Sequence, residues 1–101
     1  MALQVVTKKR FVNSLEKVTA YLKKNWSSEV AEDFYRLLIK KIDLIALHPN
    51  AGKNTTIQNT KRVLVGKGNQ NKIFYRIEKN KLILMNMKDT RMNPKRNRYY
   101  Q

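Results

Sequence analysis

Residues 28–49 read SEVAEDFYRLLIKKIDLIALHP, and this stretch decides the fold. Its apolar residues recur at spacings of three and four, which puts them on one face of an α-helix; they are Ala31, Phe34, Leu38, Ile42 and Ile45. We expect Leu37, Leu44 and Leu47 to broaden that face. Ser27 or Ser28 offers a hydroxyl that can cap the first turn. Pro49 ends the helix, because a proline ring disfavours helical backbone at the residue before it.

A second helix is expected just before this one. Its apolar stripe has the same spacing and consists of Phe11, Leu15, Val18 and Leu22. We expect this helix to run from about residue 8 to residue 24, with Thr7 as its cap. The sequence Asn25-Trp26 then interrupts the pattern, and Trp26 is expected to fill the bend between the helices. Two helices joined by so short a connection form an antiparallel hairpin.

Four short segments have the composition of β-strands: residues 3–6, 61–66, 72–78 and 81–88. In residues 72–78 one face carries Ile73, Tyr75 and Ile77, while charged residues alternate with Phe74 on the other. Residues 49–60 show no periodicity and are expected to form a loop. The order β-α-α-β-β-β predicts an α+β fold in which the helical hairpin packs on a small, mainly antiparallel sheet. We expect one domain over residues 1–101, with a basic tail from about residue 89.

The charge of the chain is strongly unbalanced, with 22 Lys and Arg against 7 Asp and Glu, a net charge of +15. Twelve of the basic residues and only two acidic ones fall after residue 60, which predicts a surface that meets phosphate. The absence of cysteine excludes disulfides and thiolate zinc sites. The single histidine, His48, excludes a histidine metal cluster, so we expect no metal and no cofactor. Without an apolar run of about 20 residues we expect no membrane span, and we expect a cytoplasmic protein.

Four segments, taken in order, resemble the RelE/ParE superfamily, the toxins of bacterial type II toxin–antitoxin modules. They are the segment after the second helix, His48-Pro49-Asn50-Ala51-Gly52, the strands Arg62-Val63-Leu64-Val65-Gly66 and Ile73-Phe74-Tyr75-Arg76-Ile77, and the segment after the last strand, Asp89-Thr90-Arg91-Met92-Asn93-Pro94. The resemblance covers residues 3 to about 96. It implies a growth inhibitor that is neutralised by a cognate antitoxin. The positive charge of the chain suggests that the antitoxin's C-terminal segment is acidic.

The resemblance leaves the target open, because one branch of the superfamily cleaves messenger RNA on the ribosome and the other acts on DNA gyrase. Cleavage without a metal needs cations at the phosphate and an acid or base. Carried over from the cleaving branch, the catalytic candidates are Lys61, Arg62, Lys72, Arg91 and Tyr99, with Tyr100 as the alternative terminal tyrosine.

The positive charge around the last strands favours the first branch, a metal-independent endoribonuclease that meets the ribosome and its messenger RNA. The long second helix and its His-Pro-x-x-Gly exit favour the alternative, a ParE-like gyrase inhibitor that is not an enzyme. A third reading is a non-toxic basic protein that binds RNA or the ribosome.

Overall fold

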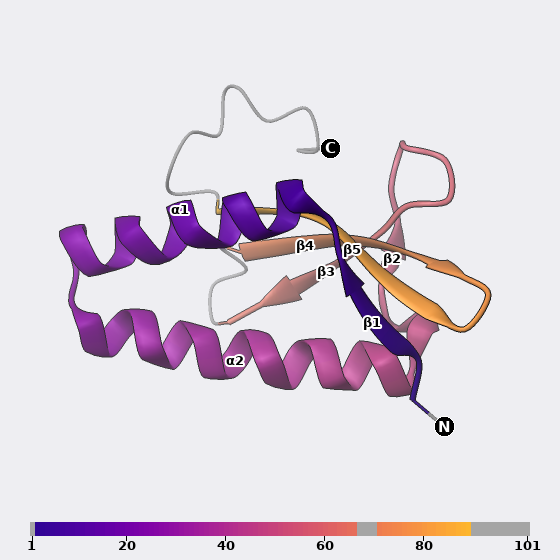
Figure 1. Cartoon of the computed structure of the whole chain (residues 1–101), viewed down its shortest axis with the longest axis horizontal. Helices are drawn as coiled ribbons and strands as arrows, with labels where there is room; N and C mark the ends of the chain where they lie inside the picture. Colours follow the sequence, from indigo (N-terminus) through magenta and orange to yellow (C-terminus); the bar gives the residue numbers. More distant parts are fainter. Residues whose placement is uncertain (1, 67–70, 90–101) are drawn as a thin grey trace.

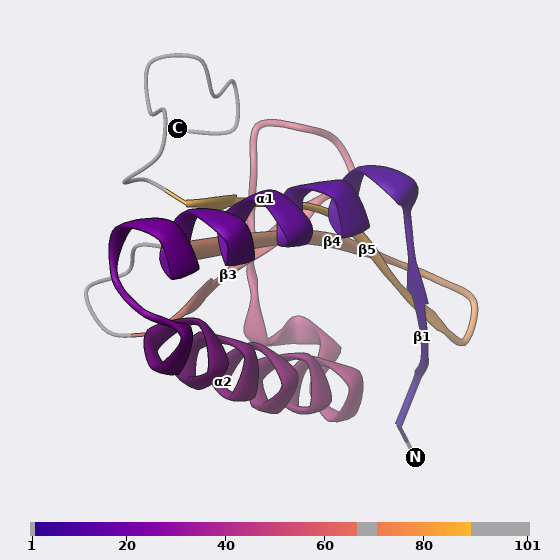
Figure 2. The ribbon, with the colours of Figure 1, turned by 60° about the vertical axis from the view of Figure 1, so that its left-hand side comes forward.

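The computed structural model of the chain describes residues 2–66 and 71–89. The elements follow one another as β1 (Gln4–Thr7), α1 (Lys9–Asn25), α2 (Ser28–Leu47), the 3₁₀ turn η1 (Pro49–Ala51), β2 (Lys53–Asn54), β3 (Lys61–Val65), β4 (Asn71–Glu78) and β5 (Lys81–Asp89). The two helices form the predicted antiparallel hairpin, which packs on the sheet (Figures 1 and 2). The α+β class and the predicted order of the helices and long strands are confirmed.

The sheet has five strands in the order β1-β5-β4-β3-β2. Strand β1 runs parallel to β5, and the other three pairings are antiparallel. The segment 49–60, expected to be only a loop, contains η1 and the two-residue strand β2. Periodicity cannot reveal a strand that short, because two residues do not complete one alternation.

Both predicted helical stripes face the core, and the α2 stripe is buried throughout. The Ser27 hydroxyl caps α2 by accepting a hydrogen bond from the Val30 N–H at 3.0 Å. The predicted Thr7 cap of α1 is wrong. Thr7 is the last residue of β1, opposite Leu84, and the residue at the cap position is Lys8, whose side chain makes no capping bond.

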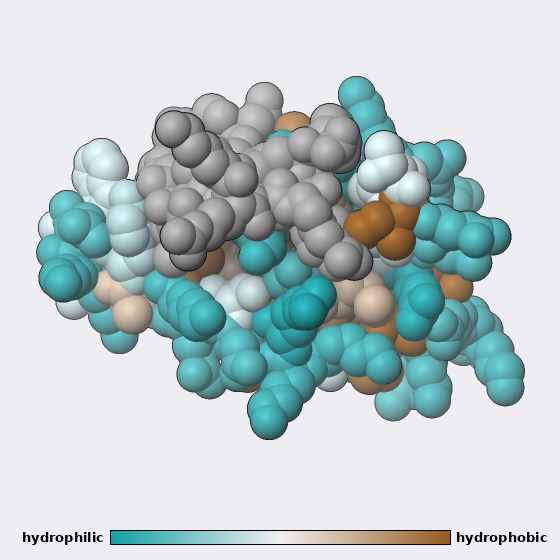
Figure 3. Space-filling view, turned by 90° about the horizontal axis from the view of Figure 1, so that it is seen from above, coloured by the Kyte–Doolittle hydropathy of each residue, from teal (hydrophilic) through white to brown (hydrophobic). Residues whose placement is uncertain are grey.

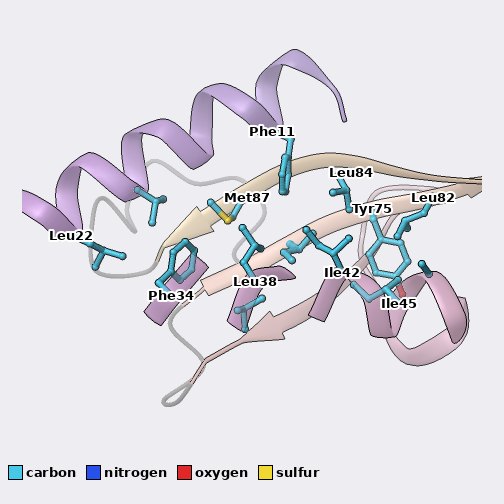
Figure 4. Close-up of a cluster of buried hydrophobic side chains, with 14 of the residues drawn as sticks. Phe11, Leu22, Phe34, Leu38, Ile42, Ile45, Tyr75, Leu82, Leu84 and Met87 are labelled. Atoms are coloured by element: carbon cyan, nitrogen blue, oxygen red, sulfur yellow. The ribbon is translucent and has the colours of Figure 1, made fainter. Parts of the chain in front are cut away.

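The core lies between the hairpin and the sheet (Figure 4). Phe11 of α1 and Leu38 of α2 extend toward the side chains of β5, which include Leu84 and Met87 (Figure 4). One side-chain hydrogen bond joins α1 to β5: the Ser14 hydroxyl donates to the Asn86 side-chain oxygen at 2.8 Å, in a partly buried position. Asn86 lies beside a β-bulge, because Phe74 faces Asn86 while the next residue, Tyr75, faces Leu84.

Two expectations for apolar residues of the hairpin are wrong. Leu37, Leu44 and Leu47 are exposed, because a helix that lies on a sheet buries only one stripe of its surface and these residues flank that stripe. Trp26 does not fill the bend; its exposed fraction is 60%. The bend is closed by backbone instead, since the N–H groups of Trp26 and Ser27 both donate to the Leu22 carbonyl.

The hydroxyl of Tyr75 connects the helical hairpin to the centre of the sheet. Tyr75 is fully buried on β4; its hydroxyl accepts a hydrogen bond from the Gly52 N–H and donates one to the Pro49 carbonyl, both at 2.9 Å. Gly52 has no room for a side chain, because a Cβ there would meet the Tyr75 hydroxyl and would lie 2.7 Å from the Arg62 carbonyl oxygen. The exit from α2 is therefore held against both β3 and β4.

We predict that Leu38→Ala lowers the free energy of unfolding by about 2–5 kcal/mol, because it leaves a cavity in the core. The adjacent Leu37 is the matched control, since its side chain is 44% exposed. Leu37→Ala should change stability by only about 0.5 kcal/mol. Urea unfolding of both variants checks this, and equal losses would show that α2 is rotated relative to the structure described here.

We predict that Tyr75→Phe lowers the free energy of unfolding by about 1–3 kcal/mol, because the Pro49 carbonyl and the Gly52 N–H lose their shared partner. Gly52→Ala should also destabilise, by steric overlap. Tyr35→Phe is the control, since Tyr35 is exposed on α2. Thermal unfolding measures the stability of the variants. If Tyr75→Phe loses no more stability than Tyr35→Phe, the buried hydroxyl does not contribute to stability.

Candidate functional site

Two of the predicted catalytic residues lie together on one face of the sheet. Arg62 of β3 is directly opposite Phe74 of β4, and Leu64 is directly opposite Lys72. Directly opposed residues of antiparallel strands share a face, and so do residues two apart on one strand. Arg62 and Lys72 are therefore diagonal neighbours on the face that also carries Phe74.

The same face carries two lysines that the sequence did not reveal. Lys53 of β2 is directly opposite Arg62, and Lys88 of β5 is directly opposite Lys72. Four adjacent strands thus contribute one cation each, and we call Lys53, Arg62, Lys72 and Lys88 the basic face. Like charges directly opposite each other destabilise a sheet, and an anion that lies over them offsets this repulsion.

The β-bulge decides where Lys88 points. Strict alternation from the core residues Leu82 and Leu84 would put Lys88 in the core as well. The bulge at residue 85 inverts the alternation, so that Met87 enters the core and Lys88 joins the basic face. Bulges commonly re-aim side chains in this way.

Lys61 lies away from these cations. It is directly opposite the core residue Tyr75, so its side chain starts from the opposite face of the sheet. Its ammonium group donates to the Asn54 side-chain oxygen at 3.0 Å. Lys61 also lines a cleft of about 620 Å³ between residues 54–60 and the end of β4, together with Gln58 and Arg76.

The electrostatics of Lys72 reflect its neighbours. Its partial burial lowers its pKa below the ordinary value of 10.5, and the positive charge of Arg62 lowers the pKa further. Both causes disfavour the charged form of Lys72 in the free protein. An anion bound across Arg62 and Lys72 would offset the repulsion between these two cations.

Two other ionisable side chains of β4, Arg76 and Tyr75, are already engaged. Arg76 shares a face with Lys72, and its Nε lies 2.8 Å from a Glu78 carboxylate oxygen, an ion pair on the surface. Tyr75 is on the core face, and burial raises its pKa above the ordinary 10.0, in part offset by the hydrogen bond from Gly52. Its buried hydroxyl is therefore a structural group and is poorly suited to proton transfer.

Arg91 and Tyr99, like Tyr100 and the rest of the basic tail, lie outside the described residues, so their roles stay predictions. Among residues 2–66 and 71–89, the structure groups no three His, Asp or Glu side chains in a way that could hold a metal ion. Within the same ranges, neither helix combines the length and the apolar character that crossing a bilayer requires.

Comparison with known proteins identifies the family. The family model of the ParE toxin of the type II toxin–antitoxin system parDE matches residues 5–94, nearly the whole chain. The chain therefore belongs to the ParE toxin family, within the RelE/ParE superfamily. It is the toxin of a type II toxin–antitoxin system, and this family membership implies a cognate antitoxin as its partner.

Solved structures with the same fold have very different sequences. A chain of the chromosomal ParDE toxin–antitoxin system from P. aeruginosa matches with a TM-score of 0.76 at 7% identity, over 87% of this chain and 96% of that chain. A chain of the RelBE2 toxin–antitoxin complex from Mycobacterium tuberculosis gives 0.57 at 11% identity, over 88% and 99%. A conserved hypothetical protein from Helicobacter pylori gives 0.56 at 17% identity, over 86% and 93%. At these identities the matches show the fold alone, and no curated protein sequence matches the chain.

We predict that Arg62→Gln raises the pKa of Lys72 toward 10.5, because it removes a neighbouring positive charge. Between its lowered folded-state pKa and 10.5, Lys72 binds fewer protons in the folded than in the unfolded chain. At neutral pH Lys72 therefore lowers the free energy of unfolding by its full amount. This destabilisation disappears as the pH rises from the folded-state pKa to above 10.5. NMR titration of the lysine side chains checks this, with Arg36→Gln on α2 as the control. An unchanged Lys72 titration in Arg62→Gln would show that the two cations do not interact.

Proposed function

We propose that the chain arrests growth by binding DNA gyrase and does not act by cutting RNA. The observation that carries the proposal is the match of residues 5–94 to the family model of the ParE toxin. The strand register is consistent with it, since Tyr75 and Asp89 start from the core face, whereas Arg62 and Lys72 lie on the basic face, and Glu78 is paired with Arg76. Acid–base catalysis needs an acid or base within hydrogen-bonding reach of the substrate.

The position of Lys61 also supports a binding role. The cleavage hypothesis needs Lys61, Arg62 and Lys72 around one phosphate. Lys61 starts from the opposite face and contacts Asn54 instead. The cations that do gather, on the basic face, extend across four strands, which suits a broad polyanionic or acidic surface better than a single scissile phosphate.

Family features favour the same target. The chain matches the ParE toxin family model, and α2 has the 20 residues expected of the gyrase branch. The His-Pro-x-x-Gly exit also fits, since Pro49 and Gly52 are the two residues that bond Tyr75. Acting on gyrase requires the chain to work in the bacterial cytoplasm, and we assign this action to a single domain over residues 1–101.

A supercoiling assay with purified gyrase and relaxed plasmid tests the proposal. The chain should inhibit supercoiling, and the double variant Arg62→Gln/Lys72→Gln should weaken inhibition at least about tenfold, because two contacts to an anionic surface are lost. Lys17→Gln/Lys24→Gln on α1 is the matched control, since it removes the same charge from another surface. Full supercoiling in the presence of the unaltered, folded chain would overturn the proposal.

Ribosome-dependent cleavage of messenger RNA is the second candidate, and the lowered pKa of Lys72 is the observation that favours it. A lysine with a lowered pKa can exchange protons nearer neutral pH than an ordinary one. Under this reading Arg62 and Lys72 would hold the phosphate, while Arg91 and Tyr99 would supply charge stabilisation and proton transfer.

The two candidates predict different outcomes for variants of the tail. If the chain binds gyrase without catalysis, Tyr99→Phe and Tyr100→Phe should arrest growth as strongly as the unaltered chain. If it cleaves RNA, loss of one catalytic hydroxyl or of the Arg91 cation should reduce the rate by about 10² or more. Growth curves after tightly controlled induction distinguish these outcomes, provided that immunoblots show equal protein levels.

A further inference from the structure

The cations of the basic face form two pairs. Lys53 of β2 and Arg62 of β3 are directly opposite each other, and so are Lys72 of β4 and Lys88 of β5. Leu64, which is opposite Lys72, comes two residues after Arg62 on β3. The second pair is therefore displaced from the first by two strand spacings across the sheet and by two residues along it.

Standard strand geometry gives the distance between these pairs. Neighbouring strands lie about 4.8 Å apart, and two residues of an antiparallel strand span about 6.8 Å. The centres of the two pairs are then roughly 12 Å apart along the backbone surface. The major groove of B-form DNA is also about 12 Å wide, with a phosphate backbone along each side. Each pair can thus approach the phosphates on one side of the groove.

The positive charge of the basic face is directed away from the helices. The helical hairpin packs on the other face of the sheet, where the core lies (Figure 2). Lys53 is exposed, and Arg62, Lys72 and Lys88 are only partly buried. A polyanion outside the chain can therefore contact all four side chains at once, and its phosphates would offset the repulsion between them.

The aromatic residue on this face indicates which form of nucleic acid fits. Phe74 lies between Arg62 and Lys72, and it is fully buried. Proteins that bind single-stranded nucleic acid stack the unpaired bases on exposed aromatic rings. The described part of the basic face offers no exposed ring for that purpose. Contact with phosphates alone suits a duplex, whose bases are already stacked.

We propose that the basic face binds the phosphate backbone of duplex DNA across the major groove. Lys53 and Arg62 contact one side of the groove, and Lys72 and Lys88 contact the other. The choice of DNA over duplex RNA rests on the proposed function, because gyrase acts on DNA. The inference goes beyond that function, since it gives the chain a contact of its own with DNA. The anionic surface that Arg62 and Lys72 meet is then the DNA that gyrase holds.

Binding of the purified chain to a short labelled duplex DNA, measured by fluorescence anisotropy without gyrase, tests the inference. Lys53→Gln/Lys88→Gln should weaken binding at least about tenfold, because two phosphate contacts are lost. It should also lower the slope of log Kd against log salt concentration by about two, and each single variant should lower that slope by about one. An unchanged slope in the double variant would overturn the proposal.

A matched control is needed because a chain with a net charge of +15 attracts any polyanion. Hydrophilic side chains also cover most of the described surface in view in Figure 3, so they are not confined to the basic face. Lys17→Gln/Lys24→Gln removes the same charge from α1 and should bind duplex DNA within about threefold of the unaltered chain. Equal losses in the two double variants would show that binding follows net charge alone, and the proposal would fail.

Other nucleic acids of the same length decide whether the partner is duplex DNA. Single-stranded RNA should bind more weakly, because the basic face has no exposed ring in its described part. Duplex RNA should bind at least about threefold more weakly, because its major groove is deep and narrow. Equal or tighter binding of either RNA would overturn the choice of DNA.

The result can be separated from the test of the proposed function. If the chain inhibits supercoiling but does not bind duplex DNA by itself, this inference fails and the gyrase proposal stands. If the chain binds duplex DNA through the basic face but leaves supercoiling unaffected, the gyrase proposal fails and the DNA contact stands.

Discussion

The hydroxyl of Tyr75 is the point on which the arrangement of the sheet depends. Within hydrogen-bonding distance of this one buried oxygen lie the carbonyl that follows α2 and the N–H of Gly52, which leads into β2. The carbonyl of Arg62 packs so close to Gly52 that only a glycine fits. These contacts of Tyr75 and Gly52 therefore fix the path of the chain from the end of α2 to β2 and β3. They thereby help to fix where Arg62 and Lys53 lie on the basic face.

Much of the fold could be predicted from the sequence because it is encoded in local periodicity. The α2 stripe, the Ser27 cap, the helix end before Pro49 and the alternation in β4 all follow from residues close together in the chain. The errors have a common physical cause. Trp26, Leu37 and Thr7 were assigned by local pattern, whereas their environment is set by which side of each element the rest of the molecule covers.

The basic face could be predicted only in part, for the same reason. Arg62 and Lys72 are on strands with clear alternation, and the sequence identified both. Lys53 belongs to a two-residue strand without a pattern of its own, and Lys88 follows a bulge that inverts the alternation. Lys61 is a basic residue on β3, as the cleavage hypothesis requires. The register nevertheless places it opposite Tyr75, on the other face of the sheet. Register between strands is a long-range property, and neither composition nor spacing along the chain reports it.

Opposed like charges give no stability to a sheet, and a surface that keeps them is better explained by its partner than by its fold. We propose gyrase as that partner, and the most direct measurement is to map the 5′ ends of messenger RNA within minutes of inducing the chain. If growth stops because gyrase is bound, no new ends should appear at codons occupied by ribosomes while growth is arrested. New ends at those codons that disappear with Arg91→Ala would contradict the gyrase proposal and establish the chain as a ribonuclease.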